Sequence, residues 1–213
     1  MKKSILIVAL IMAAVLGSCS KSDPVSPGGN NTGTSDSYYP TTVGYWWEYN
    51  STLPDYPSSY KVTIDGEEIK SGKTYSVAST TVPNAGKSYF RVDNNVLYSI
   101  GPNAYGLDEN TEFKQLDFNL AVGDSTVIVG TNPLGYPQRQ TTIMMEKGTT
   151  YSAANGITYK DVIMLRTNVY FEPSPGFLIF VGSVDYYFAK GIGFISSDAG
   201  SKGMVEIKDY NVK

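Results

Sequence analysis

Residues 44–50 read GYWWEYN, and this stretch gives the clearest indication of the fold. Four of its seven positions are aromatic, and aromatic side chains favour extended strands. Successive side chains of a strand point to opposite faces of a sheet, so Trp46 and Trp47 must lie on opposite faces. Trp47 shares its face with Tyr45 and Tyr49, whereas Trp46 shares the other face with Glu48. We therefore predict that Trp47 enters the core and that Trp46 is the better candidate for stacking on a ligand. Tyr45, Trp46 and Trp47 together form a weak candidate ligand-binding group.

Most of the remaining chain repeats this strand-like pattern. The best helical candidate, Lys160–Arg166, is short and lies between Tyr159 and Thr167, so it fits a strand better. The run Phe177–Val181 (FLIFV) is apolar throughout and predicts a strand buried on both faces. Turn signals separate the segments at Asp65-Gly66, Asp93-Asn94-Asn95, Asn155-Gly156 and Ala199-Gly200-Ser201. The predicted strands are Gly44–Asn50, Tyr60–Ile64, Thr74–Ser79, Ser88–Val92, Val96–Ile100, Ser125–Val129, Thr141–Met145, Thr158–Thr167, Phe177–Phe188, Gly191–Ser196 and Met204–Tyr210.

These segments predict an all-β fold, a single domain with one curved antiparallel sheet, half-barrel or sandwich-like. A weak internal repeat suggests two similar halves. Three motifs recur in the same order with different spacings: Val43-Gly44 and Val122-Gly123, then Gly72-Lys73-Thr74-Tyr75 and Gly156-Ile157-Thr158-Tyr159, then Tyr89-Phe90 and Tyr187-Phe188. Such short motifs also occur commonly in β-hairpins, so chance recurrence stays open as the alternative.

The N-terminus has the features of a cleavable secretion signal. Lys2 and Lys3 precede Ile5–Leu16, an uncharged apolar run of 12 residues, which is shorter than the roughly 20 needed to span a bilayer. Leu16-Gly17-Ser18-Cys19 then resembles the lipobox of bacterial lipoproteins. The resemblance implies cleavage after residue 18 and a thioether-linked diacylglycerol on Cys19, and two or more acyl chains hold a protein stably at a membrane. Cys19 is also the chain's only cysteine, so no intramolecular disulfide can form.

A tether is expected to connect this lipidated residue to the domain. Residues 20–37 contain no aromatic residue and only one large aliphatic, Val25, so we predict that residues 19–37 comprise the lipidated cysteine and a disordered tether. The all-β domain then spans residues 38–213. Losing Lys2 and Lys3 with the signal leaves 15 basic against 20 acidic residues. This mild acidity argues against nucleic-acid binding, which needs a basic surface.

Several short motifs resemble a group of secreted β-sheet lipoproteins of Bacteroidota whose function is unknown, some of them labelled TapB-like. The motifs are Tyr39-Pro40, Val43-Gly44-Tyr45-Trp46-Trp47-Glu48-Tyr49, Leu120-Ala121-Val122-Gly123-Asp124-Ser125, Gly156-Ile157-Thr158-Tyr159-Lys160-Asp161-Val162-Ile163 and Tyr187-Phe188-Ala189-Lys190-Gly191-Ile192-Gly193. Ser20 is not the aspartate that retains some lipoproteins at the inner membrane, so the outer membrane is favoured. The resemblance itself implies a curved antiparallel sheet and an extracytoplasmic location. It implies no activity.

The composition argues against most enzyme classes. The chain has no histidine, which removes the usual triads and histidine metal sites, and its one thiol is expected to carry lipid. A glycoside hydrolase would need two facing carboxylates. Lys190 is a further candidate base, although one lysine at a strand end is ordinary. The candidate carboxylates are Asp65, Glu67, Glu68, Asp108, Glu109, Glu112 and Asp117.

The sequence gives only weak indications of metal or ligand binding. Asp108-Glu109-Asn110 with Glu112, or Asp93-Asn94-Asn95, could offer oxygen ligands to calcium, but neither has EF-hand spacing and we predict no metal or cofactor. With 17 Tyr, 8 Phe and 2 Trp, the aromatic content allows a platform for glycans or a concave site for an apolar ligand. The leading hypothesis is a non-enzymatic, membrane-anchored binding or interaction module. A carrier of lipid or another apolar ligand and a carboxylate glycoside hydrolase are the alternatives.

Overall fold

Alternating side chains along the chain build twelve strands within the part that the structure covers. The structure is a computed structural model of the chain, and it describes residues 36–54, 56–100, 111–131, 137–174 and 176–212. Cys19, the predicted signal and nearly all of the predicted tether lie outside these residues. The strands are β1 (Trp46–Ser51), β2 (Ser59–Lys70), β3 (Lys73–Thr80), β4 (Ser88–Asp93), β5 (Val96–Ile100), β6 (Glu112–Asp117), β7 (Ser125–Thr131), β8 (Pro137–Ser152), β9 (Thr158–Ser174), β10 (Phe177–Ala189), β11 (Gly193–Asp198) and β12 (Met204–Asn211).

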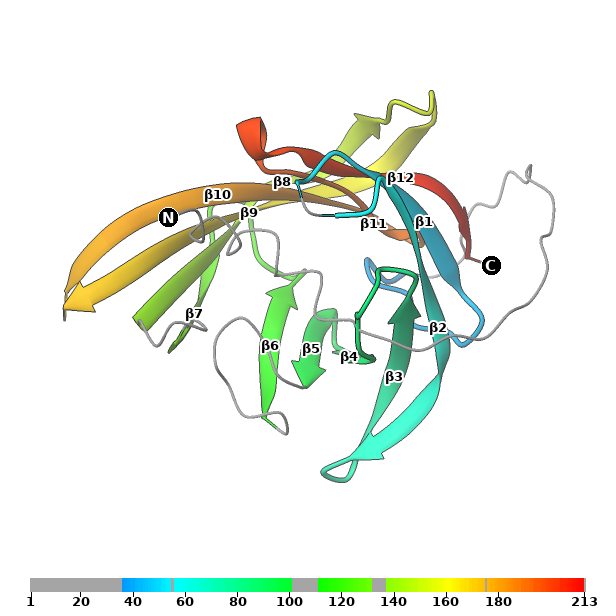
Figure 1. Cartoon of the computed structure of the whole chain (residues 1–213), viewed down its shortest axis with the longest axis horizontal. Coiled ribbons are helices and arrows are strands. Elements are labelled where there is room, and N and C mark those ends of the chain that lie inside the picture. Colours follow the sequence, from blue (N-terminus) through cyan, green and yellow to red (C-terminus); the bar gives the residue numbers. More distant parts are fainter. Residues whose placement is uncertain (1–35, 55, 101–110, 132–136, 175, 213) are drawn as a thin grey trace.

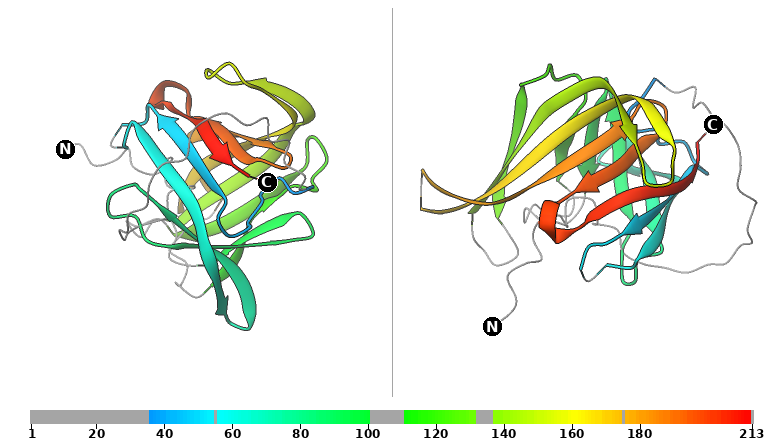
Figure 2. Two further views of the ribbon diagram at one scale, coloured as in Figure 1. Left: turned by 90° about the vertical axis from the view of Figure 1, so that its right-hand side faces the viewer. Right: turned by 90° about the horizontal axis from the view of Figure 1, so that it is seen from above.

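The strands form one antiparallel sheet that curves into a nearly closed, barrel-like shape (Figures 1 and 2). The order across the sheet is β6-β5-β4-β3-β2-β1-β12-β11-β10-β9-β8-β7. The sheet is therefore two six-stranded meanders, β1–β6 and β7–β12, joined where β1 pairs with β12. The prediction of a curved all-β antiparallel sheet is confirmed. Besides a 3-10 turn at Gly200–Lys202, the described residues contain no helix, and none that could cross a membrane.

The two meanders begin with the same backbone arrangement. The amide of Gly44 donates to the carbonyl of Ile64 at 2.8 Å, and the amide of Gly123 donates to the carbonyl of Met144 at the same distance. Both glycines have positive φ, 88° and 93°, which a residue with a Cβ adopts with difficulty. Ile64 and Met144 are both buried. The Val-Gly dipeptides of the predicted repeat thus occupy equivalent places in the fold.

The aromatic residues that flank these glycines extend the correspondence. Tyr39 lies five residues before Gly44, and Phe118 lies five residues before Gly123. The ring centroids of Tyr39 and Phe90 are 5.5 Å apart at 60°, and those of Phe118 and Phe188 are 5.3 Å apart at 63°. Phe90 and Phe188 belong to the sequence motifs Tyr89-Phe90 and Tyr187-Phe188, which lie in β4 and β10, the fourth strand of each meander. The two predicted halves correspond in topology and in packing.

Three expectations about individual segments were wrong. Glu112–Asp117 forms an edge strand, β6, which pairs with β5 on one side only and which the predicted strands did not include. Asp65-Gly66 is an irregularity inside β2 and the hairpin turn comes later, at Ser71-Gly72. The run Phe177–Val181 is a strand, as predicted, but it is not buried. Phe177 and Phe180 are 61% and 58% exposed, because this part of β10 pairs with β9 alone and extends beyond β11.

The core fills the inside of the curved sheet. Ile163 and Leu165 of β9 and Phe188 of β10 are fully buried, and they pack in the same cluster as Trp47 and Ile64. Because the cluster draws on both meanders, their inner faces share a single core. This arrangement places Trp47 and Tyr49 of β1 and Tyr60 of β2 toward the interior.

Candidate functional site

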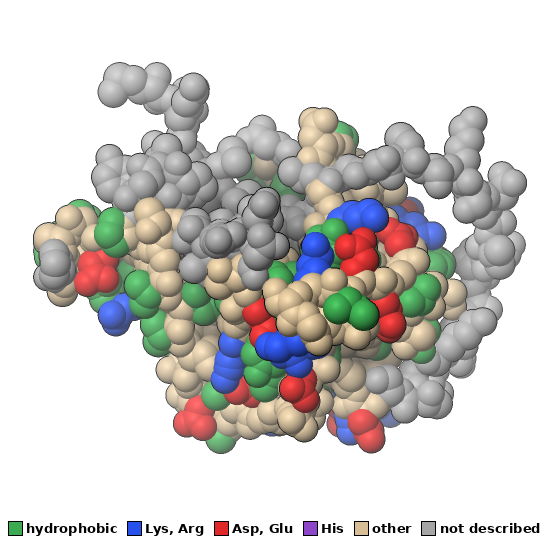
Figure 3. All heavy atoms as spheres, turned by 90° about the horizontal axis from the view of Figure 1, so that it is seen from below, with side chains coloured by type: hydrophobic (Ala, Val, Ile, Leu, Met, Phe, Trp, Pro, Cys, Tyr) green, Lys and Arg blue, Asp and Glu red, His purple; other side chains and the backbone are tan. Residues whose placement is uncertain are grey.

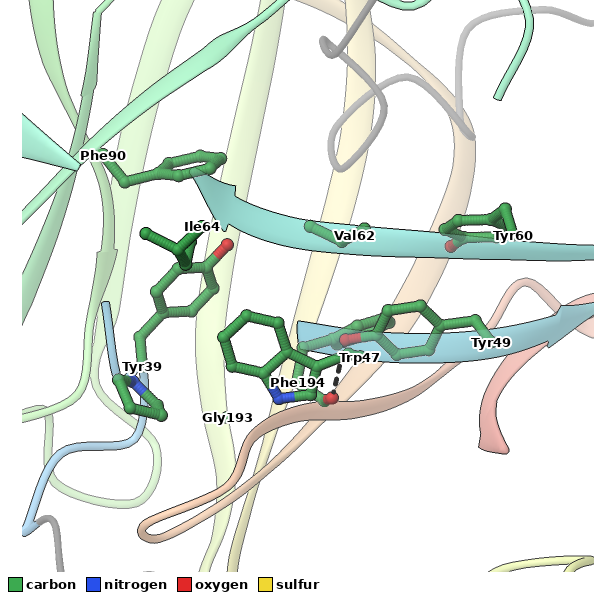
Figure 4. Close-up of a pocket in the computed structure, with 10 residues that line it drawn as sticks. Tyr39, Trp47, Tyr49, Tyr60, Val62, Ile64, Phe90, Gly193 and Phe194 are labelled. Atoms are coloured by element: carbon green, nitrogen blue, oxygen red, sulfur yellow. Dashed lines mark hydrogen bonds between the residues drawn. The ribbon is translucent and has the colours of Figure 1, made fainter. Parts of the chain in front are cut away.

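An aromatic pocket opens on the inner side of β1 and β2 (Figure 4). It leaves about 50 Å³ of space for water-sized molecules, which corresponds to roughly three to five waters. Six of its ten lining residues are aromatic and none is charged, so it suits one ring or the end of an acyl chain better than a whole lipid. The lining residues are Tyr39, Pro40, Trp47, Tyr49, Tyr60, Val62, Ile64, Phe90, Gly193 and Phe194.

The strand period of β1 places two of these rings in the pocket and ties them to β11. Trp47 and Tyr49 are two residues apart, so both side chains point to the inner face, and they are 5% and 4% exposed. The indole Nε1 of Trp47 donates to the carbonyl of Ile192 at 2.7 Å. The hydroxyl of Tyr49 donates to the carbonyl of Phe194 at 3.1 Å. Both rings are therefore held in fixed orientations by the turn before β11 and by its first residues.

Gly193 shapes one wall of the pocket. Its φ is 103°, which disfavours any residue with a Cβ. An added Cβ would lie 3.3 Å from Cδ of Pro40 and 3.6 Å from Nε1 of Trp47. The glycine thus lets the N-terminal segment and the indole approach the start of β11 closely.

Two tyrosine hydroxyls bring hydrogen-bonding capacity to this apolar site. The structure shows no hydrogen-bond partner within the described residues for the hydroxyl of Tyr39 or that of Tyr60. Burial raises the pKa of Tyr39 and, together with the nearby Tyr56, the pKa of Tyr60 above the usual tyrosine range. Both phenols therefore stay neutral and can donate a hydrogen bond at any physiological pH. The site can hold an apolar group and supply one or two donors to a polar atom on it.

The predicted ligand-binding group divides between the two faces of β1. Trp47 lies inside, as predicted, and lines the pocket. Trp46 is half-buried on the other face, with Nζ of Lys61 3.9 Å from its ring centroid. Tyr45 is half-buried, packs against the core and does not line the pocket. The lysine occupies a face of the Trp46 indole that a stacking ligand would need.

Three of the five candidate carboxylates within the described residues, Glu68, Glu112 and Asp117, lie in ion pairs. Glu112 accepts hydrogen bonds from Nζ of Lys73 at 2.5 Å, from the hydroxyl of Tyr75 at 2.6 Å and from Nε of Arg91 at 3.0 Å. Partial burial raises the pKa of Glu112, but these three donors outweigh the burial and hold the pKa at about 2. Glu112 is therefore a fixed, ionised carboxylate, which suits a structural role better than proton transfer.

The other sequence candidates are dispersed. Asp117 pairs with Lys114 at 2.7 Å, and Glu68 lies 3.7 Å from Lys87. Within the described ranges, no three acidic or cysteine side chains form a group that could hold a metal ion. Asp65 and Glu67 lie along the exposed part of β2, Asp93-Asn94-Asn95 forms the β4–β5 turn, and Lys190 pairs with Asp36 at 2.8 Å. Asp108, Glu109 and Asn110 lie outside the described residues.

Reasoning from sequence missed most of the pocket. Tyr39-Pro40, Tyr89-Phe90 and the Gly191-Ile192-Gly193 turn were noted as motifs, but no role was assigned to them. Tyr60 and Phe194 carried no signal. These motifs taken together with Trp47 could have indicated the pocket, because the fold brings the motifs of both meanders to one place.

Comparisons with known proteins indicate fold but no activity. No protein-family model matches the chain, and no curated protein matches it in sequence. Two crystal structures of proteins from Bacteroidetes are similar. A candidate lipoprotein from Parabacteroides distasonis superposes with a TM-score of 0.52 at 10% identity, over 83% of this chain and 99% of that one. A candidate exported protein with a YmcC-like fold, from Bacteroides fragilis, gives a TM-score of 0.50 with the same identity and coverage.

Proposed function

We propose that this protein is a lipoprotein of the bacterial envelope, anchored through acyl chains on Cys19, and that it acts there as a non-enzymatic binding module. Three observations support the proposal. The N-terminal 19 residues have the n-region, short apolar run and lipobox of a lipoprotein precursor. The fold resembles two structures described as a candidate lipoprotein and a candidate exported protein. Serine at residue 20 favours the outer over the inner membrane.

The ligand that the geometry supports best is an apolar group, either an aromatic ring or the end of an acyl chain, which enters the aromatic pocket. The observation that carries this proposal is the lining itself, six rings without a charged side chain. Where the ligand is a ring that carries an oxygen, the hydroxyls of Tyr39 and Tyr60 would donate to that oxygen. A glycan stacked on Trp46 is less well supported, because Lys61 already lies over that indole. A hydrolase is less well supported too, because Glu112 is held by three donors.

The two tryptophans provide a direct test, because only Trp47 lines the pocket. Trp46→Phe leaves Trp47 as the sole indole, and the matched control Trp47→Phe leaves only Trp46. We would titrate both variants with a bromine-tipped fatty acid, whose heavy atom quenches indole fluorescence at short range. We expect saturable quenching of Trp47 and little quenching of Trp46. Equal quenching of both indoles, or none of Trp47, would refute binding in the pocket.

A second pair of variants tests the role of the hydroxyls. Tyr60→Phe removes one donor and keeps the ring, so it should weaken binding of acetophenone, whose ring carries a carbonyl oxygen, by about fivefold to tenfold, the value of one hydrogen bond. Binding of the bromine-tipped fatty acid, whose inserted end carries no oxygen, should not change. Tyr56→Phe serves as the control, because the ring centroids of Tyr56 and Tyr60 are 6.0 Å apart but Tyr56 does not line the pocket. Unchanged affinity for acetophenone in Tyr60→Phe would show that its hydroxyl does not meet the ligand.

A further inference from the structure

The tip of the β9–β10 hairpin is an exposed apolar surface that the pocket does not explain. Phe177, Leu178, Ile179 and Phe180 are 61%, 39%, 46% and 58% exposed. Four consecutive residues of a strand point to both faces, so neither face of this segment is covered. Tyr170 packs on Phe180, with 5.6 Å between the ring centroids. We refer to residues 170–180, excluding 175, as the hairpin tip.

The hairpin tip projects beyond the strands on either side (Figures 1 and 2). The pairing of β9 with β8 ends at Phe171, and β10 pairs with β11 only from Asp185 onward. Among the described residues, only Tyr170 and Phe171 at the base of the tip pair with a strand outside the hairpin. This exposes large apolar side chains at the end of a projecting hairpin, and exposed apolar patches mark interaction surfaces in soluble proteins.

The charges of the tip suit a neutral, apolar partner. Glu172 is its only charged residue, and one oxygen of that carboxylate accepts a hydrogen bond from the amide of Gly176 at 2.8 Å. The β2–β3 hairpin also projects from the sheet, but its end carries Glu67, Glu68, Lys70 and Lys73. Figure 3 shows acidic and basic side chains interleaved over the central and right-hand parts of the face it presents. The tip thus combines exposed apolar side chains with almost no charge, unlike the end of the β2–β3 hairpin.

The tip can reach a bilayer to which the protein is anchored. The described part of the domain begins beside the base of the hairpin, where the carbonyl of Ser37 accepts a hydrogen bond from the amide of Gly191 at 2.9 Å. The 13 residues of β10 separate that point from the tip, about 40 Å at the usual strand rise. The 17 residues between Cys19 and Ser37 can extend to at most about 60 Å. A lipid on Cys19 therefore allows the tip and the anchor to lie in one bilayer.

We propose that the hairpin tip inserts into the acyl-chain boundary of the membrane that holds the lipidated Cys19, and so fixes the orientation of the domain on that membrane. This inference rests on the lipid anchor of the proposed function. Phenylalanine, leucine and isoleucine supply the apolar area that interfacial segments bury among headgroups and chains. Insertion at a second point would hold the pocket at a constant height above the bilayer. The near-neutral tip predicts that insertion depends little on anionic lipid.

The test uses the lipidated full-length mature protein in phosphatidylcholine vesicles. The only native cysteine carries the lipid, so Leu178→Cys can be labelled at a single site with an environment-sensitive dye. Ile69→Cys, at a 77% exposed residue near the end of the β2–β3 hairpin, is the matched control. Nitroxide-labelled lipids quench dyes that enter the acyl region. We expect quenching of the dye at residue 178, none of that at residue 69, and little change when phosphatidylglycerol replaces part of the lipid.

The outcomes separate the hairpin from the anchor. Protein that floats with the vesicles while both dyes stay unquenched would overturn hairpin insertion and leave the anchor standing. A mature mass without diacylglycerol would refute the anchor, and quenching of the residue-178 dye on added vesicles would then decide whether the tip inserts alone. A dye at residue 178 that is shielded from water but unquenched, in a particle of two chains, would show that a second copy covers the tip and would overturn the proposal.

In a second variant, Phe177→Ser with Phe180→Ser, the apolar area is removed at positions where the side chains are largely exposed, so folding should be retained. This double change should lower the quenching of a residue-178 dye by about tenfold or more, from the area the two rings would bury. Unchanged quenching in the folded double variant would contradict insertion through the tip.

Discussion

Replacing each of the two adjacent tryptophans by alanine should have very different effects on stability. Trp47 is 5% exposed, and its Nε1 donates to the carbonyl of Ile192 at 2.7 Å. Removing a buried large aromatic side chain costs about 3–5 kcal/mol, and the unpaired carbonyl adds about 1 kcal/mol. Trp46 is half-buried, and the contact of its ring with Lys61 contributes about 0.5–1 kcal/mol. With its partial burial, Trp46→Ala should cost only about 1–2 kcal/mol.

Urea denaturation followed by circular dichroism measures this difference, because that signal does not depend on the indole removed. We expect Trp47→Ala to be less stable than Trp46→Ala by about 3 kcal/mol. Trp47→Phe is the control, since it keeps a ring in the core and should cost about half as much as the alanine variant. Equal and severe losses in both alanine variants would refute the two-face argument and would mean that β1 is buried on both sides.

Three further changes have defined outcomes. Glu112→Gln should destabilise the protein by about 2 kcal/mol near neutral pH, allowing for its partly exposed partners. Because the folded-state pKa of Glu112 lies at about 2, below the ordinary 4.5, its contribution is present above pH 4.5 and is lost as the pH falls toward 2, so melting curves of variant and parent should converge there. Gly193→Ala should lower the stability by about 1–3 kcal/mol, because the φ of 103° at this position strains any residue with a Cβ. The added Cβ lies beside Trp47, so the change should also weaken quenching of Trp47 by the fatty acid. An unchanged melting temperature would contradict the strained geometry. A chain that begins at Ser37 should melt at the same temperature as the mature protein, since it loses from the described domain only Asp36 and its exposed ion pair with Lys190; a clear loss would mean that earlier residues pack on the domain.

The sequence predicted the sheet well where local pattern decides structure. Aromatic and β-branched alternation correctly placed β1, and the side-chain period alone correctly assigned Trp47 to the core. Positive-φ residues at Asn94 and Asn95 confirm the predicted turn there. The repeat of Val-Gly predicted two halves, because each meander needs the same glycine conformation at its start.

The predictions that failed concern features set by residues that are distant in the chain. Phe177–Val181 has the composition of a buried strand. It is exposed because β11 and β8, which flank the β9–β10 hairpin, stop pairing before its tip. The acidic stretch at Glu112 pairs as an edge strand because Lys73, Tyr75 and Arg91 from other strands meet its carboxylate. The pocket joins the segment at Tyr39 to both meanders, and no local pattern encodes that meeting.

The binding of an apolar group in the aromatic pocket is the central claim, and a crystal structure of the mature protein grown with a bromine-tipped fatty acid tests it most directly. The account predicts one anomalous bromine peak between the rings of Tyr39, Trp47 and Phe90, with the pocket walls otherwise unchanged. A peak only on the outer face near Trp46, or an empty pocket at saturating ligand, would contradict it.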